Sequence, residues 1–321
     1  MGVLEPILAS KIGLRRYWFC VKMIMRKQIL SLFLCLWIGL LATSCARAAK
    51  SPLQKTTKPL LLVSIPPYQS LVQQIAGEGF DVLTVVPPSA DPHTYEPTAR
   101  QLTQISEGQL WFRIGEPFEQ KLLPLLQKAK TKDLRQGLPM IELPDHHHCG
   151  HFHDDSFDRH IWLSPKMISS QITAIAETLS EQFPEHKEAF LARASALQKE
   201  LCNLDREIEL RLHETSKRSF LVSHPAFAYF CRDYNCHQLS IEQEGKEPRA
   251  KEIEQVLQIA LATGAELAIA IPQHNNKGAQ LVARKLKIPV RFIDPYADDC
   301  METMRKLAKL IENPYQTDDA P

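Results

Sequence analysis

The chain lacks an excess of charge of either sign and lacks the short motifs that define many enzymes. Lys and Arg together number 38 and Asp and Glu number 37, which leaves a formal charge of +1. We therefore expect no nucleic-acid partner held by counterion release. The chain has no glycine-rich phosphate loop, no H-E-x-x-H motif and no carboxylate placed as an obvious general base. These absences favour a protein that is not an enzyme.

Long hydrophobic runs are also few. The longest, Ile29–Ala42, follows Arg26 and Lys27 and is shorter than the roughly 20 apolar residues that span a bilayer. A basic segment followed by a short apolar run is typical of a secretory signal. We predict a leader and signal peptide over residues 1–48, with Met25 as an alternative start, and a periplasmic or otherwise extracytoplasmic protein.

Two processing sites compete at the end of this leader. Ala46-Arg47-Ala48 fits a signal peptidase, whereas Leu41-Ala42-Thr43-Ser44-Cys45 is a loose lipobox in which Cys45 would carry a lipid anchor. A leader that stays uncleaved is a third alternative. Export permits disulfides, but the cysteines beyond the leader are odd in number and the sequence fixes no pairing. They are Cys149, Cys202, Cys231, Cys236 and Cys300.

Apolar runs of strand length alternate with segments of helical spacing in both halves of the chain. Strands that are apolar on both faces indicate parallel sheets covered by helices. We predict an α/β fold with two lobes, each a mostly parallel sheet flanked by helices. The predicted strands are 60–65, 82–86, 110–114, 219–223, 267–271 and 290–293. The predicted helices of the lobes are 68–76, 98–106, 225–232, 250–263 and 278–286.

Two helical stripes separate the halves. Apolar residues recur at spacings of three and four over 168–179 and, after Pro184, over 190–212. One interpretation is a stiff connection between lobes, and the other is a pair of surface helices on one large domain. The predicted divisions are a leader (1–48), an N-terminal lobe (49–164), connecting helices (165–216) and a C-terminal lobe (217–321).

Three isolated histidines and one aspartate follow or interrupt strand-like runs. They are His93, His160, His224 and Asp294. Loops at the carboxyl ends of parallel strands meet in a crevice, where such side chains can converge. Three imidazoles and one carboxylate suit a first-row divalent metal, and a nitrogen-rich set suits zinc better than manganese. Each residue also has a structural interpretation, as a turn residue, a packed histidine or a helix cap.

Five further histidines form a separate tract without helical or strand periodicity. They are His146, His147, His148, His151 and His153, interleaved with Cys149 and aspartates. Histidine-rich tracts bind metals loosely, and acidification weakens them because imidazole then takes a proton. The tract is an auxiliary metal loop or, alternatively, a solvated polar loop.

Six short segments occur in an order that matches a known family. They are Ser64–Pro67, Val86–His93, Asp158–Pro165, Ser223–Phe230, Glu247-Pro248 and Ile293–Pro295. They resemble the metal-binding solute-binding proteins of zinc- and manganese-type ABC importers, the cluster A-I family. The resemblance covers nearly all of the chain after the leader.

The resemblance implies a metal held between two lobes that a single long, rigid helix joins. His93 and His160 would come from the first lobe, and His224 and Asp294 from the second. It further implies a monomer that captures a divalent metal and delivers it to an ABC permease of the inner membrane with its ATPase. The tract resembles the histidine-rich loop of zinc-type members, so zinc ranks before manganese or iron.

The chain departs from the family pattern at one loop. Members usually carry an acidic residue where this chain has Ile271-Pro272-Gln273-His274, so His274 is a substitute ligand, a gate or an ordinary loop histidine. Tyr95 and Glu96 are candidates to fix the tautomer of His93, or else surface residues. Two other functions remain alternatives: a zinc-dependent hydrolase, which also uses three histidines and an open position, and a surface adhesin or metal reservoir.

Overall fold

The computed structural model describes residues 58–143, 157–242 and 249–316, all within one compact unit, Thr57–Pro321. The predicted leader with Cys45, the histidines at 146, 147, 148, 151 and 153, and the Glu247-Pro248 segment lie outside the described residues. Within the described ranges, no helix is long and apolar enough to cross a membrane.

The first half of the described chain contains a four-stranded parallel sheet in the order β2-β1-β3-β4. Its elements are β1 (Leu60–Val63), α2 (Pro66–Ala76), β2 (Asp81–Thr84), α3 (Ala99–Ile105), β3 (Leu110–Arg113), α4 (Pro117–Leu122) and β4 (Lys130–Asp133). The three strands predicted here are confirmed. The fourth, β4, was missed because it is an edge strand of polar residues and carries no apolar run.

The second half repeats this topology in the order β6-β5-β7-β8, again parallel throughout. Its elements are β5 (Ser219–Val222), α7 (Ala228–Tyr234), β6 (His237–Ser240), α8 (Ala250–Thr263), β7 (Ala268–Ala270), α9 (Lys277–Leu286), β8 (Val290–Phe292) and α10 (Cys300–Glu312). The edge strand β6 was missed for the same reason as β4. Helix α10 was also missed, although Met304, Leu307, Ala308 and Ile311 give it a buried apolar stripe.

Both faces of the two central strands of the second sheet, β5 and β7, are buried, which explains their continuous apolar runs. Along β5, Phe220 and Val222 belong to the large core that continues into the first half, while Leu221 belongs to a smaller core against α8 and α9. Because successive side chains of a strand point to opposite faces, one short run supplies both cores.

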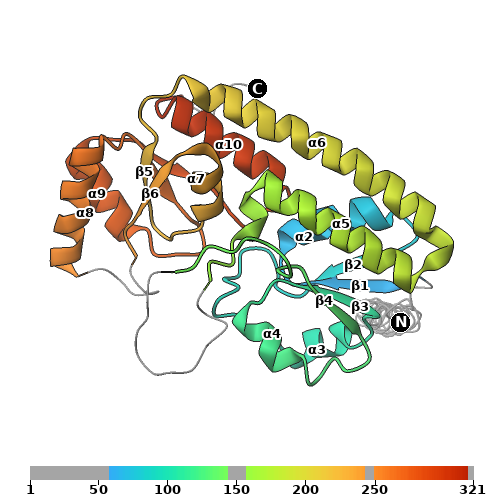
Figure 1. Ribbon diagram of the computed structural model, residues 1–321. Helices are drawn as coiled ribbons and strands as arrows, with labels where there is room; N and C mark the ends of the chain where they lie inside the picture. The colour runs from blue at the N-terminus through green and yellow to red at the C-terminus, as the bar shows by residue number, and fades with distance from the viewer. Residues whose placement is uncertain (1–57, 144–156, 243–248, 317–321) are drawn as a thin grey trace, which may run out of the picture. The chain divides into compact units, whose positions relative to one another are not determined.

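Two helices link the sheets: α5 (Pro165–Gln182) and, after the turn η3 (Pro184–His186), the 27-residue α6 (Lys187–His213). Helix α6 packs against α2 and α5 at one end and against α10 at the other, and Figure 1 shows α10 beside it. Arg305 of α10 also donates to Glu207 of α6 at 3.0 Å. The predicted architecture of two α/β lobes and a long connecting helix is confirmed.

Candidate metal centre

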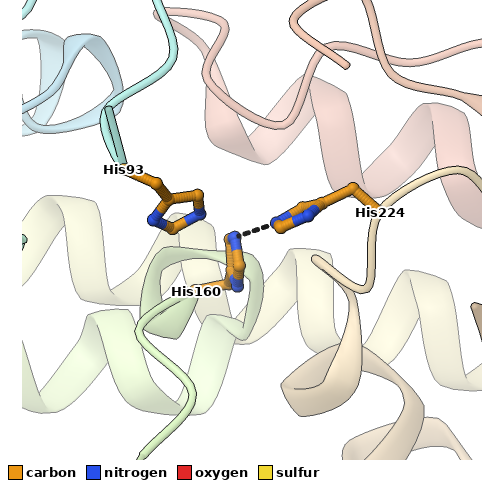
Figure 2. Close-up of side chains that lie close together, drawn as sticks. All are labelled: His93, His160 and His224. Atoms are coloured by element: carbon orange, nitrogen blue, oxygen red, sulfur yellow. Dashed lines mark hydrogen bonds between the residues drawn. The ribbon is translucent and has the colours of Figure 1, made fainter. Parts of the chain in front are cut away.

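Three histidines from distant parts of the sequence meet at one point. His93 lies in the loop after β2, His160 directly precedes the short helix η2 (Ile161–Leu163), and His224 follows β5. One ligand atom from each ring lies within 4.8 Å of the other two. Figure 2 shows the three rings turned toward one another. The sequence prediction that these residues converge thus agrees with their placement.

His93 is held by a buried carboxylate. Its Nδ1 lies 3.0 Å from Oε2 of Glu116, a residue that the sequence analysis did not single out. Glu116 lies beside Gly115, which has a φ of +85° and whose missing Cβ would lie 2.1 Å from the Arg135 guanidinium. Glycine is therefore required in the turn that delivers Glu116. The loop of His93 is fixed in turn by Asp91, which accepts a hydrogen bond from the His93 amide at 2.9 Å.

His160 has a carboxylate partner only two residues before it. Oδ1 of Asp158 accepts hydrogen bonds from both the backbone amide and Nδ1 of His160, each at 2.8 Å. The backbone carbonyl of Asp158 accepts from the Tyr229 hydroxyl at 2.7 Å. Trp162 donates through Nε1 to the Pro295 carbonyl at 2.7 Å. These bonds tie the His160 loop to two segments of the second half.

His224 has the third carboxylate. Its Nδ1 lies 3.2 Å from Oε2 of Glu242, which follows the edge strand β6. The preceding Ser223 accepts a hydrogen bond from the Ile271 amide at 3.0 Å, so the ends of β5 and β7 are joined where the histidine leaves the sheet. All three imidazoles therefore have a carboxylate at Nδ1.

This arrangement fixes the tautomer of each ring. A carboxylate accepts a proton from Nδ1, so Nε2 of a neutral ring keeps its lone pair and faces the centre. Nε2 of His160 and Nε2 of His224 lie 3.3 Å apart. Two lone pairs at that distance repel unless a cation lies between them. Tetrahedral zinc with Zn–N bonds of 2.0–2.1 Å separates neighbouring nitrogens by about 3.3 Å, so the spacing suits this ion.

A phenol completes the group. The hydroxyl of Tyr296 lies 3.2 Å from Nε2 of His93 and 3.3 Å from Nε2 of His160. Burial raises the pKa of Tyr296 well above its ordinary value, so the group is a neutral hydroxyl at physiological pH. It can donate its one proton to only one of the two nitrogens at a time.

The charges around the centre are unequal. Burial disfavours a charged His93, but the nearby Glu116 carboxylate outweighs it, and the pKa of His93 lies above its ordinary value. For Glu116, burial opposes ionisation, yet His93 keeps the pKa of this carboxyl below its ordinary value. Burial lowers the pKa of His224 to about 4, with a smaller opposing effect of Glu242. Despite its own burial, Glu242 has a pKa lowered to about 2 by its histidine partners.

The fourth predicted ligand, Asp294, is not part of the histidine group that the described residues form. Its Oδ1 accepts hydrogen bonds from the Tyr296 amide at 2.8 Å and from Nε2 of Gln273 at 2.9 Å. Asp294 thus closes the turn that positions Tyr296. Glu96, proposed as a partner of His93, is exposed and pairs with Lys121.

His274 lies beside the centre. Its ring stacks on that of His224, with centroids 3.9 Å apart and planes inclined by 9°. Its Nδ1 lies 3.4 Å from Oε2 of Glu242, the oxygen that His224 also approaches. His274 thus lies next to the centre. The sequence alone did not decide whether this residue is a substitute ligand, a gate or an ordinary loop histidine.

Residues 61–313 match the family described as ZnuA, zinc-uptake complex component A, periplasmic. The chain belongs to this family. A putative metal-binding protein of Chlamydia trachomatis serovar D is 36% identical over 259 residues, which cover 80% of this chain and 92% of that relative. The zinc-binding lipoprotein AdcA of Streptococcus pneumoniae strain R6 is 31% identical over 225 residues, 66% of this chain and 44% of AdcA. A crystal structure of ZnuA superposes with a TM-score of 0.75 at 34% identity, covering 81% of this ZnuA-family chain and 100% of that one.

Proposed function

We propose that this ZnuA-family chain captures a divalent metal ion, with zinc preferred, at His93, His160 and His224 and delivers it to an ABC permease. The observation that carries the proposal is the convergence of three imidazoles whose tautomers are fixed by carboxylates at Nδ1. Carboxylate–histidine pairs of this kind orient metal ligands and raise their basicity. The family's description as a zinc-uptake component supports zinc as the cargo.

The choice of metal follows from the donor atoms. Three nitrogens favour zinc over manganese, which gains more from oxygen donors, and iron is the third candidate. The turn that contains Asp294 and Tyr296 supplies the fourth donor. In our proposal this is the Asp294 carboxylate, which reaches the ion by turning from its hydrogen bonds in the turn, and Tyr296 is the competing oxygen.

The family's description as a zinc-uptake component supports transport rather than catalysis at this site. The metal is then a cargo that binds and leaves, and the protein delivers it as a monomer outside the inner membrane to a permease with its ATPase. The periplasmic description of the family and the lipoprotein AdcA support this location, with anchoring through Cys45 as the alternative to release. A zinc-dependent hydrolase would instead turn over ester or peptide substrates in the metal-loaded and not in the metal-free state.

The test is metal binding by the full exported chain, purified without a tag. We expect zinc to bind with one tight equivalent and to displace manganese in competition. Because the ligands come together only in the folded protein, zinc at a hundredfold excess over Kd should stabilise it by about 2.7 kcal/mol. A melting temperature that neither zinc nor manganese changes would contradict the proposal, as would tight zinc binding that survives His160→Ala.

A further inference from the structure

A second group of possible metal ligands lies entirely within the second half of the described chain. His224 follows β5, Glu242 follows β6 and His274 follows β7, and one ligand atom from each lies within 4.8 Å of the other two. The three strands are neighbours in the order β6-β5-β7. Their carboxyl ends bring these loops together without any residue of the first half. The three-histidine centre, in contrast, needs both halves.

The geometry of this group suits a metal ion. Oε2 of Glu242 lies 3.2 Å from Nδ1 of His224 and 3.4 Å from Nδ1 of His274. These distances are close to the edge of about 3.3 Å that zinc–ligand bonds of 2.0–2.1 Å give in a tetrahedron. The stacked rings present both Nδ1 atoms to the same oxygen. Two nitrogens and one oxygen would leave a coordination position for water.

His274 has no other evident task. Its side chain is 11% exposed, and its Nε2 is buried with no hydrogen-bond partner among the described residues. The turn that carries His274 does not depend on the imidazole. Asn276 forms hydrogen bonds with the amide and carbonyl of Ile271 and with the His274 carbonyl, at 2.9 to 3.0 Å. A buried nitrogen without a partner is unfavourable, so the placement of this imidazole calls for a compensating interaction, which a metal ion at its other nitrogen, Nδ1, would supply.

We propose that His224, Glu242 and His274 form a second metal position, next to the three-histidine centre and alternative to it. The inference rests on the proposed function, because the same cargo would occupy both positions. At the first position His224 binds through Nε2 and carries its proton on Nδ1. At the second it binds through Nδ1, so the proton is lost from Nδ1 to solvent and Nε2 takes one up. A neutral His224 therefore serves one position at a time.

The second position would assist the release of the metal ion from the protein. When the ligands of the first half no longer hold the ion, His224 and its two neighbours can keep it on the second half. The ion then has three protein ligands and an open side, from which another set of ligands can remove it.

The test isolates the second position by removing the first. In the full chain, His93→Ala/His160→Ala leaves the second group intact, and binding of zinc and of Co2+, followed by its visible absorption, is measured. His274→Phe in that background keeps a stacked ring without a ligating nitrogen. His274→Gln keeps a donor for Glu242 but is a poor ligand. The histidine-rich tract contributes equally to all three proteins.

We expect the double variant to bind one equivalent of either metal at least about tenfold more tightly than both triple variants, a loss in the range seen when a metal site loses supporting groups. Equal binding by the double variant and His274→Phe would overturn the proposal. So would a loss in His274→Phe that His274→Gln restores, because the hydrogen bond alone would then matter. The proposed function is judged separately, by whether the double variant loses the tight binding of the wild-type chain.

Discussion

The two halves of the chain share one sheet topology but support their imidazoles differently. In the first half each histidine has its own carboxylate, Glu116 for His93 and Asp158 for His160. In the second half, His224 and His274 share the single carboxylate of Glu242. The difference matters for His93 and His224, because a nearby carboxylate favours the charged form of an imidazole while burial disfavours it.

The pKa shifts follow this division. Burial opposes the charging of His93, but its own carboxylate raises its pKa above the ordinary value. Burial dominates at His224 and lowers its pKa to about 4, with the neighbouring histidines adding to this effect and the hydrogen bond to Glu242 opposing it. His224 is therefore a neutral ligand at any pH well above about 4. His93, whose pKa is raised, must be in its deprotonated form to bind a metal, so its binding competes with protonation more strongly than that of His224.

The largest expected effect comes from His160→Ala, at the point where the halves meet. Nε2 of His160 faces both His224 and Tyr296, so its loss removes a ligand and the geometry of its neighbours. We expect zinc affinity to fall by well over the roughly 100-fold that loss of an outer partner can cause. Deletion of residues 146–153 should cost much less, because a loosely binding tract adds only auxiliary capacity. Titration calorimetry on both variants measures the contrast.

The matched control for this comparison is His213→Ala. His213 is exposed, with 75% of its side chain accessible, and pairs with Glu214 at the end of α6. It should leave zinc affinity unchanged. If deleting the tract abolished tight binding while His160→Ala were mild, the centre would lie elsewhere in the chain.

The next effect concerns stability without metal. The pKa of His224 is 6.5 in the unfolded chain and about 4 in the folded protein. Between pH 6.5 and pH 4, His224 is therefore protonated in the unfolded chain and neutral in the folded protein. The free energy of unfolding should therefore fall as the pH falls through this range, by roughly 3 kcal/mol from this residue. The raised pKa of His93 acts in the opposite sense, since its contribution is present below pH 6.5 and is lost as the pH rises through the folded value.

Urea unfolding of chelator-treated protein from pH 4 to pH 8 measures these slopes. His224→Gln should remove much of the loss on acidification, and His93→Gln should remove a stabilisation that acid provides. If the pH dependence of the free energy of unfolding changed in the same direction in both variants, the proposed difference between His93 and His224 would be wrong.

A smaller effect is expected from the carboxylates. Glu116→Gln and Asp158→Asn each release one imidazole, and each should weaken zinc by about 10- to 100-fold. Glu242→Gln disturbs two rings at once and should lie at the upper end of that range. Zinc-binding isotherms of the three variants show which substitution weakens zinc binding most. A Glu242→Gln variant milder than both others would show that His224 needs no orienting partner.

The sequence predicts the parts of this protein that a local pattern can encode. Each central strand is an apolar run and α8 has helical spacing, so their places were found from sequence alone. The edge strands β4 and β6 were missed because their exposure removes the apolar signal. Local context also singled out the three histidines that the structure brings together.

The partners of these histidines were not predictable in the same way. Glu116 lies 23 residues from His93, and Glu242 lies 18 residues from His224. Such pairs depend on which strands become neighbours, and an isolated glutamate in a loop carries no sign of its partner. Asp158 is different, since it lies two residues before His160, and the Asp-x-His spacing was a local signal that could have been used.

The smallest expected effect decides the fourth donor. The carboxylate of Asp294 is a charged oxygen in the turn that also contains Tyr296, and its Oδ1 accepts hydrogen bonds from the Tyr296 amide and from Nε2 of Gln273. If Asp294 turns to bind the metal, Asp294→Asn should weaken manganese more than zinc, because zinc can replace the oxygen with water beside three nitrogens. Tyr296→Phe removes a neutral hydroxyl and should change both affinities similarly, within about tenfold. Competition titrations with zinc and manganese measure the difference between the two affinities in each variant. If Asp294→Asn weakens zinc and manganese binding equally, Asp294 only supports the turn. If Tyr296→Phe then weakens zinc binding more than Asp294→Asn does, the phenol of Tyr296 is the oxygen ligand.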